Sequence, residues 1–373
     1  MSSGGATLQG SFSGATGTIY ETGFYYGTTS GDLDQQVTGS ESIGSLASGD
    51  FDYEITSLSP STTYYYKAYV LEWDESRSSY VERFGTERSF TTEAASSNIP
   101  TGWLELPAVT GSEDFVGKFY GSGSEVGTNR NYSYYYNYTY YASLWVAYPL
   151  CGTHKSGSAS GSSWAYNPDV PTSPTNRQVK VRQGDGSYTT MYGDSTYSRG
   201  HQCPNADRKS DSQMNAQTYY VTNQTPQRQN KFNGSIWGSL ETAERELVSG
   251  AADTVYVVTG PVYRKKGGSE TIHYLTGAAG KGANPASLAI PNYYYKAFLK
   301  VKRNGNGGIT SASAIGFWFE HRDYNSDTES FDQFAVSVAQ IESWTGFDLF
   351  TNLPSGLQAT AEANTSWTSF QSF

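Results

Sequence analysis

The sequence predicts an amino-terminal all-β sandwich followed by an α+β domain with a central antiparallel sheet. The chain has 373 residues, which at about 150 residues per domain corresponds to two or three domains. Aromatic residues make up 15% and charged residues only 16%, which excludes a disordered chain and disfavours a coiled coil. Short runs rich in Tyr, Thr and Val, divided by turn residues, favour strands.

Residues 1–93 form the predicted sandwich. Turn residues divide residues 6–92 into short alternating segments, a pattern typical of β-sandwiches. The stretch from Leu58 to Tyr64 has the pattern Leu-x-Pro-x-Thr-x-Tyr and resembles the E–F corner of fibronectin type III domains, where the Tyr is architectural. This part contains neither His nor Cys, so we expect a spacer or adhesive role and no catalysis.

Residues 94–102 are small and polar, which predicts a linker, and residues 103–373 form the second predicted domain. The first hundred residues hold 13 acidic and 4 basic residues, whereas the remainder holds 22 and 21. The second domain is therefore nearly neutral and permits a polyanionic ligand. No run approaches the about 18 apolar residues that span a bilayer, and the first ten residues show no basic-then-apolar leader pattern.

The strands predicted for the second domain are residues 131–141, 143–150, 254–261, 293–301 and 314–319. The first two are expected to pair antiparallel, with the second of them central in the sheet. Residues 254–261 form a continuous apolar run, which predicts a strand buried on both faces. The Tyr-rich run at 131–141 has two interpretations, a stacking platform for bases or sugars, or an amphipathic strand, and strand propensity favours the second.

Two helices are predicted, at residues 233–249 and 330–344. Apolar residues recur at helical spacing from Ile236 to Leu247, which gives the first helix one stripe that faces a core. Gly250 follows this helix and provides a C-cap signal.

A second stripe of the first helix consists of Asn233, Trp237, Glu241 and Arg245, because residues four apart share a face. One interpretation is an exposed Glu–Arg pair, worth a few tenths of a kcal/mol. The other is the edge of a metal site. Asn233 and Glu241 are about 12 Å apart along the axis, so the amide would bind the ion directly and the carboxylate would hold a water. Mg²⁺ accepts such a sparse site when substrate phosphate completes it.

One of the four histidines has a distinctive local sequence. His201 lies between Arg199 and Arg208, with Gly200 directly before it and Pro204 shortly after. The glycine allows close backbone approach, and the two guanidinium groups are donors suited to phosphate. We expect structural or surface roles for the other histidines, His154, His273 and His321.

Four segments occur in a fixed order along the second domain. They are Tyr-Ser-Arg-Gly-His-Gln-Cys-Pro at 197–204, Thr-Asn-Gln-Thr-Pro-Gln at 222–227, Phe-Asn-Gly-Ser-Ile-Trp-Gly-Ser-Leu-Glu at 232–241 and Val-Val-Thr-Gly-Pro at 257–261. Together they resemble the DNA/RNA non-specific endonuclease family, and the resemblance extends from about Trp103 to Pro354. It implies a ββα-metal (His-Me finger) active site.

The same resemblance implies how this site would act. His201 corresponds to the general base that takes a proton from the attacking water, a role suited to a neutral imidazole. Asn233 corresponds to the sole protein ligand of Mg²⁺, for which Mn²⁺ can substitute. Glu241 corresponds to a carboxylate that holds water bound to the metal.

Phosphate binding is assigned by the same resemblance. Arg245 matches an arginine that holds the phosphate, Arg199 matches the motif arginine, and Asn223 matches an Asn that orients the site. An arginine that often precedes the Trp-x-x-x-Pro stretch is replaced here by Ser162-Ser163. Phosphate binding is therefore expected to rely on Arg199, Arg208 or Arg245.

The sequence departs from the family pattern at two other points. Ser198 occupies the position of the usual Asp, and we expect a quantitative effect because that carboxylate is neither the base nor the ligand. The interval from Pro226 to Asn233 is one residue longer than usual, which makes Asn230 the alternative ligand.

The two cysteines, Cys151 and Cys203, are buried free thiols, a disulfide or metal ligands, although two are too few for a four-sulfur zinc site. If the strand that ends at Cys151 neighbours the His201 segment, a disulfide would pin the catalytic loop and indicate an oxidising compartment. With the adhesive module and the missing leader pattern, this predicts a bacterial enzyme that is secreted or attached to the cell envelope, whose leader is absent from this chain.

Taken together, the residues predict a Mg²⁺-dependent, sugar-non-specific endonuclease that hydrolyses phosphodiester bonds in DNA and RNA. Contacts to phosphates carry little base readout. The alternatives are a surface binding or adhesion protein and an inactive protein with the nuclease fold. The residues specify no oligomeric state.

Overall fold

The computed structural model shows two compact units, one formed by the first 97 residues and one by the described residues from 102 onward. The structure describes residues 5–39, 44, 46–56, 58, 62–92, 102–122, 129–161, 163–170, 178–181, 196–251, 253–275, 280–282 and 288–373. Apart from Gly102, the predicted linker at 94–102 lies outside the described residues.

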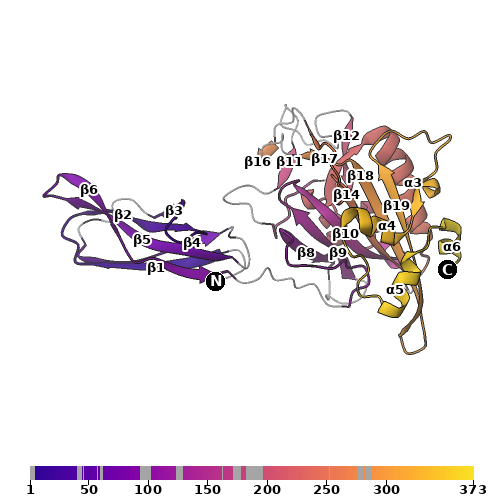
Figure 1. The fold of residues 1–373 in the computed structure, drawn as a ribbon, viewed down its shortest axis with the longest axis horizontal. Helices are drawn as coiled ribbons and strands as arrows, with labels where there is room; N and C mark the ends of the chain where they lie inside the picture. Colours follow the sequence, from indigo (N-terminus) through magenta and orange to yellow (C-terminus); the bar gives the residue numbers. More distant parts are fainter. Residues whose placement is uncertain are drawn as a thin grey trace. The chain divides into compact units, whose positions relative to one another are not determined.

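The first unit is all-β, as predicted (Figure 1). Its strands are β1 (Gly5–Ser13), β2 (Ile19–Gly27), β3 (Gln35–Thr38), β4 (Ser48–Thr56), β5 (Thr63–Asp74), β6 (Ser79–Phe84) and β7 (Arg88–Thr91). β1 pairs with β4, and a second antiparallel sheet has the order β3-β2-β5-β6, with β7 also paired to β5. Leu8, Phe24, Ile55 and Tyr64 come from both sheets and form the core. Strands β3 and β6 were not predicted, because most of their side chains are exposed.

The predicted E–F corner is described only at its two ends. Leu58 and Tyr64 are both buried, in the core of the first unit. Residues 59–61, which carry the Pro of the motif, lie outside the described residues. The likeness to fibronectin type III domains therefore stays a prediction.

A mixed α+β second unit is built on a central antiparallel sheet, as predicted. In the described part of the chain, this sheet has seven strands in the order β20-β19-β18-β14-β10-β9-β8. Each neighbouring pair is antiparallel. The strands are β8 (Phe115–Tyr120), β9 (Arg130–Asn137), β10 (Ala142–Cys151), β14 (Thr254–Val262), β18 (Tyr293–Arg303), β19 (Ile309–Glu320) and β20 (Ala335–Val336).

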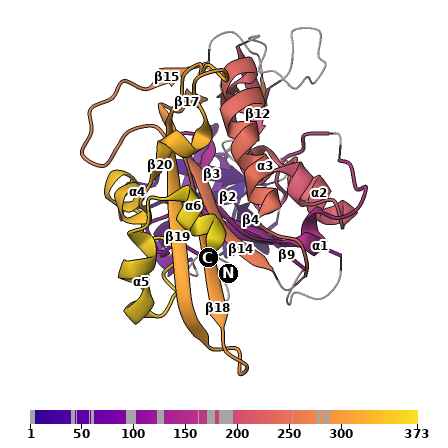
Figure 2. The same ribbon diagram turned by 90° about the vertical axis from the view of Figure 1, so that its right-hand side faces the viewer.

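Both faces of this sheet are buried. One face packs against a π-helix, η4 (Gln229–Trp237), and the α-helix that continues it, α3 (Gly238–Glu246). The other packs against α4 (Val338–Thr345) and α5 (Ser355–Glu362). Figure 2 shows α3 on one side of strands β18 and β19, with α4 and α5 on the other. The continuous apolar run in β14 is explained by this double cover, because alternate side chains enter different cores.

The Tyr-rich run forms part of the core and no stacking platform. Tyr132, Tyr134 and Tyr136 of β9 are 2%, 0% and 0% exposed. They belong to the core beneath η4 and α3. Tyr135 points to the opposite face, where it packs against the second core. The run is therefore a strand, as the second interpretation held, but neither of its faces is a wet one.

The two predicted helices are interrupted. Residues 233–249 do not form one α-helix, because η4 kinks at Ser235 (φ −131°, ψ −108°) before α3 begins, and α3 ends at Glu246 without using Gly250. Residues 330–344 begin with a 3₁₀ turn, η6 (Phe331–Phe334), and strand β20. Only then does Ser337 cap α4, with its Oγ accepting a hydrogen bond from the Gln340 N–H.

The remaining elements are short. They are α1 (Gly152–Lys155), β11 (Val179–Val181), β12 (Tyr197–His201), η2 (Asn205–Asp207), α2 (Ser212–Gln217), η3 (Val221–Asn223), β13 (Gln224–Arg228), β15 (His273–Tyr274), β16 (Gly280–Gly282), β17 (Ala289–Ile290) and α6 (Trp367–Ser372). Across the described ranges, no helix has the length and apolar character needed to cross a bilayer.

Candidate active site

An antiparallel pair of strands and the helix that follows it bring the strand of His201 into contact with the helix of Asn233. β12 pairs antiparallel with β13, from Tyr197 opposite Arg228 to His201 opposite Gln224. η4 follows β13 directly and contacts β12. As a result, Asn233 of η4 donates a hydrogen bond from Nδ2 to the Ser198 Oγ at 3.0 Å, on the same strand that ends at His201.

The His201 ring lies between two aromatic rings. Its centroid is 4.7 Å from that of Trp164 and 4.9 Å from that of Tyr219. Two backbone hydrogen bonds join the segments that carry these rings, from Ala165 N to Tyr219 O and from Val221 N to Ala165 O. Burial lowers the pKa of His201 to about 4. The imidazole is therefore neutral at pH 7, the form that can accept a proton.

Asn233 has an oxygen available for a hard cation. Both hydrogen bonds that its side chain makes to the described residues use Nδ2, with Ser198 Oγ and with Gln229 Oε1 as acceptors. Ser198 is held in turn, because its Oγ donates to the Gln227 carbonyl at 3.2 Å. The amide is therefore oriented with Oδ1 free, which fits an ion such as Mg²⁺ that prefers oxygen ligands.

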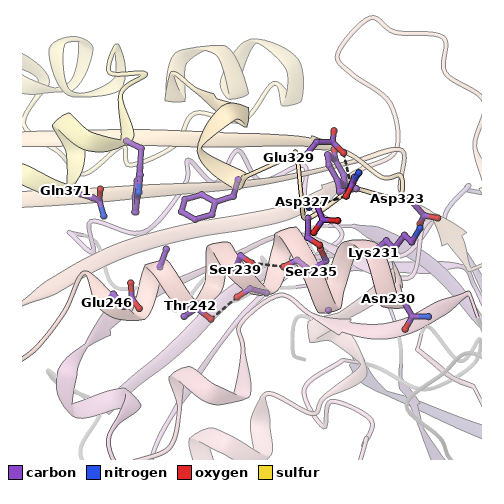
Figure 3. A pocket seen from close by; sticks show the side chains of 18 residues that line it. Asn230, Lys231, Ser235, Ser239, Thr242, Glu246, Asp323, Asp327, Glu329 and Gln371 are labelled. Atoms are coloured by element: carbon purple, nitrogen blue, oxygen red, sulfur yellow. Dashed lines mark hydrogen bonds between the residues drawn. The ribbon is translucent and has the colours of Figure 1, made fainter.

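The alternative ligand, Asn230, lies elsewhere on the same helix. It is exposed and lines a groove on the face of η4 and α3 shown in Figure 3. Four carboxylates and one Lys line this groove, namely Glu246, Asp323, Asp327, Glu329 and Lys231. Asp323 and Glu329 are paired with Arg228 and Arg322, so the lining is only mildly acidic.

Helix α3 carries two further predicted residues, Glu241 and Arg245. Burial raises the pKa of Glu241. Arg245 is 23% exposed, and its Nη1 lies 3.0 Å from Asp207 Oδ1 while Nη2 donates to Thr242 Oγ1. Trp237, from the same predicted stripe, is 1% exposed and packs in the core. The stripe thus combines one core residue with polar groups that lie near the edge of the core.

A fully buried ion pair fixes α3 on the sheet. Lys296 of β18 and Glu244 of α3 are both 0% exposed, with Nζ and Oε2 2.7 Å apart. Tyr148 of β10 donates from its hydroxyl to Glu244 Oε1 at 2.8 Å. Although burial alone would lower it, the neighbouring carboxylates raise the pKa of Lys296. Losing either charge would leave the other buried and unpaired, which is strongly destabilising.

Asn223 and Arg199 are buried behind the site. Asn223 accepts a hydrogen bond from Cys203 N through Oδ1, and its Nδ2 donates to the carbonyls of Cys203 and Thr218, all at 2.8–2.9 Å. It therefore holds the loop that follows His201. Arg199 is 4% exposed, on β12 opposite Pro226.

The expectation that Arg208 contacts phosphate is wrong. Arg208 is fully buried, and its guanidinium donates to Asn131 Oδ1 and to the carbonyls of Asn131, Asp207 and Pro149. It also lies 5.0 Å from the Tyr148 ring centroid. The guanidinium of Arg208 therefore donates its hydrogen bonds to four acceptors inside the protein. The sequence alone had suggested that it lies beside His201.

The predicted Cys151–Cys203 disulfide is also wrong, because both cysteines are free and buried. The strand that ends at Cys151, β10, does contact the segment of His201, because Gln202 Nε2 donates to the Ser143 carbonyl at 2.8 Å. Ser143 lies eight residues before Cys151 on this strand, which is about 26 Å of extended chain. Cys151 Sγ instead contacts His154 Nδ1 at 3.6 Å, and burial raises the pKa of Cys203 to about 12.

The other histidines have the structural or surface positions expected of them. His154 is 2% exposed and contacts Cys151. His321 accepts the Arg228 N–H at Nε2, 2.9 Å away, which leaves Nδ1 to donate to the Pro291 carbonyl. His273 is exposed on β15.

Sequence reasoning missed three residues at the site. Trp164 was noted only as a landmark, and Tyr219, one of two adjacent tyrosines, carried no signal. Asp207 was not singled out, because its pairing with Arg245 joins segments 38 residues apart. Such contacts depend on the tertiary fold and have no local pattern.

Sequence comparison places the second unit in a known class of protein. The family model for the DNA/RNA non-specific endonuclease matches residues 113–356. This is more than half of the chain, and the chain therefore belongs to the DNA/RNA non-specific endonuclease family. In the described residues, no group of three or more His, Cys, Asp or Glu could hold a metal ion.

Three nucleases illustrate the relationship. The chain is 28% identical to Nuclease 1, mitochondrial, of Schizosaccharomyces pombe over 51% of its length, and 29% identical to Nuclease EXOG, mitochondrial, of Danio rerio over 62%. It is 29% identical to Nuclease of Serratia marcescens over 59%. The chain spans 56%, 62% and 72% of these relatives, respectively. A chain in the crystal structure of the EndoG/EndoGI complex is 22% identical, with a TM-score of 0.42 over 64% of this chain and 89% of that one.

Proposed function

We propose that this protein is a Mg²⁺-dependent endonuclease that hydrolyses phosphodiester bonds in DNA and RNA. In this proposal β12, β13 and η4 form a ββα-metal motif. The observation that carries it is that His201 lies on the same strand whose Ser198 orients the Asn233 amide. A base and a cation-binding oxygen on neighbouring elements are what water-dependent cleavage of a phosphodiester requires.

Each side chain has a defined task in the proposed reaction. The neutral His201 imidazole takes a proton from the attacking water, and the Trp164 and Tyr219 rings fix its orientation. Asn233 Oδ1 would hold Mg²⁺, which supplies charge stabilisation at the phosphate when bound. Arg245 offers its guanidinium to the anionic oxygens, and Glu241 would orient water in the metal's coordination sphere. Mn²⁺ can take the same oxygen ligand.

The substrate is expected to be recognised through its phosphates. The proposed site residues His201, Asn233 and Arg245 address water, metal and phosphate, which every nucleic acid provides. Contacts of this kind position a nucleic acid without reading its sequence. Both DNA and RNA are therefore expected substrates. In the same proposal the first unit is a fibronectin type III-like spacer of a bacterial enzyme that is secreted or attached to the cell envelope.

A nicking assay tests the proposed function. The full chain incubated with supercoiled plasmid and millimolar Mg²⁺ is expected to give open-circular and then linear DNA, and to degrade single-stranded RNA. A chelator should stop both reactions, and added Mn²⁺ should restore them. A purely adhesive or inactive protein would retard the nucleic acid in a gel, or ignore it, and leave it intact in every condition.

The pH profile should show that the general base has an unusually low pKa. Because burial lowers the pKa of His201 from 6.5 to about 4, the neutral form persists as the pH falls through 6.5. We expect kcat/KM to stay nearly constant from pH 7 to about 5 and to be halved near about pH 4. In the unfolded chain, His201 binds a proton at its ordinary pKa of 6.5, whereas in the folded protein it does so only near pH 4. This residue therefore costs the folded state nothing above pH 6.5, and it lowers the free energy of unfolding as the pH falls below 6.5. Activity should be measured at temperatures where unfolding is negligible, and a midpoint near 6.5 would show that the ring is solvated.

A further inference from the structure

We propose that Asp207 is a positioning residue that holds the Arg245 guanidinium in place for the substrate phosphate. The inference rests on the proposed function, because it assigns Asp207 a role only through Arg245. Asp207 ends the η2 turn that follows the His201 loop, whereas Arg245 lies in the last turn of α3. The contact between them therefore joins the segment of the base to the helix of the phosphate ligand.

The geometry of the pair is asymmetric. Asp207 is 0% exposed, and its Oδ1 lies 3.0 Å from Arg245 Nη1. Its Oδ2 is buried and has no hydrogen-bond partner within the described ranges. Arg245 is 23% exposed and has one further side-chain partner, Thr242 Oγ1, at 3.1 Å. One end of the pair is thus fixed in the interior while the other reaches the surface.

The backbone of Asp207 is fixed as well. Its N–H donates to the Pro204 carbonyl at 3.1 Å, and its own carbonyl accepts a hydrogen bond from Arg208 Nη1 at 2.9 Å. Arg208 is anchored in turn on Asn131 and Pro149. The carboxylate therefore has little freedom to follow Arg245, so Arg245 must adapt to it.

The charges around Asp207 argue against a role in stability alone. Burial and the nearby Glu244 carboxylate raise the pKa of Asp207, opposed by Lys296, Arg245 and Arg208. A carboxyl that is costly to ionise beside Glu244 is a poor choice for stabilising a fold. A fixed acceptor for the Arg245 guanidinium, whose side chain is 23% exposed, gives this arrangement a use, because preoriented cationic donors stabilise phosphoryl charge most effectively.

A double-mutant cycle tests the proposal in the full chain. The variants are Asp207→Ala, Asp207→Asn, Arg245→Ala and the double variant Asp207→Ala/Arg245→Ala, with kcat and KM measured separately on one DNA duplex in Mg²⁺. Glu329→Ala is the matched control, since it removes the carboxylate partner of another arginine, Arg322, 2.6 Å away in the same unit. Its kinetic constants should be unchanged.

Asp207→Ala is expected to lower kcat/KM about tenfold or more in the unmodified chain and by less than about twofold when Arg245 is already Ala. Asp207→Asn keeps an acceptor oxygen and should retain activity within about threefold. Equal losses in both backgrounds, or no loss in the unmodified chain, would overturn the positioning role while cleavage itself stands. Absence of cleavage by the unmodified protein and by Glu329→Ala would instead overturn the proposed function, and the positioning role with it.

Discussion

Replacing His201 by Ala is expected to lower kcat for plasmid nicking by about 10²–10⁴-fold, the usual contribution of a general base. The imidazole lies between the Trp164 and Tyr219 rings and is neutral at pH 7 because burial lowers its pKa. No other histidine can take its place, since His154 and His321 are held by structural contacts. The rate should be measured with saturating Mg²⁺ and DNA.

The matched control is His273→Ala, which removes an exposed histidine of the same unit. It should nick DNA at the unmodified rate. The His201→Ala variant should also keep its far-UV circular dichroism and unfold cooperatively, so that a lost fold is not mistaken for a lost base. Nicking at an undiminished rate by a folded His201→Ala variant would remove this residue from the mechanism.

Replacing Asn233 by Ala is expected to lower kcat/KM by at least about 10²-fold and to raise the Mg²⁺ concentration for half-maximal rate by about 10–100-fold. The reason is that Asn233 Oδ1 is the proposed protein ligand, with its amide oriented by Ser198. A titration of nicking rate against Mg²⁺, at a DNA concentration well below KM, measures both quantities at once.

The same helix provides the control for this prediction. Asn230 differs from Asn233 by three positions and lies exposed in the acidic groove of Figure 3. Asn230→Ala should leave the Mg²⁺ titration unchanged. If the two variants behave in the reverse way, the ligand is Asn230 and the orienting role of Ser198 is lost as well.

The predicted fold depended on patterns that are local in the chain. Continuous or alternating apolar runs located β9, β10, β14, β18 and β19, because burial on a sheet face imposes such patterns directly on sequence. Exposed strands such as β3 and β6 carry no pattern of this kind and were missed. The short strand β20 was taken for helix, because its pairing with β19 is a tertiary contact.

The candidate site likewise contains residues that local motifs predict and residues whose roles depend on the tertiary fold. His201, Asn233, Glu241 and Arg245 were predicted from motifs that are contiguous or evenly spaced along the chain. The contacts of Arg208 and of Cys203 depend on which residues the fold brings beside them. The predicted phosphate contact of Arg208 and the predicted disulfide of Cys203 were therefore wrong. Asp207, Trp164 and Tyr219 acquire their roles only through contacts between distant segments.

The π-helix η4 explains where this domain can change length without losing its chemistry. The interval before Asn233 resembles the family pattern with one residue added, and a π turn is the form of helix that holds an additional residue. Gain or loss of a residue in η4 before Asn233 can be taken up in the width of one turn, which leaves Asn233 and α3 in place. In α3 the same change would rotate everything beyond it by about 100° and turn Arg245 away from Asp207. Natural length variation among related chains should therefore fall before Asn233 and spare the stretch from Asn233 to Arg245.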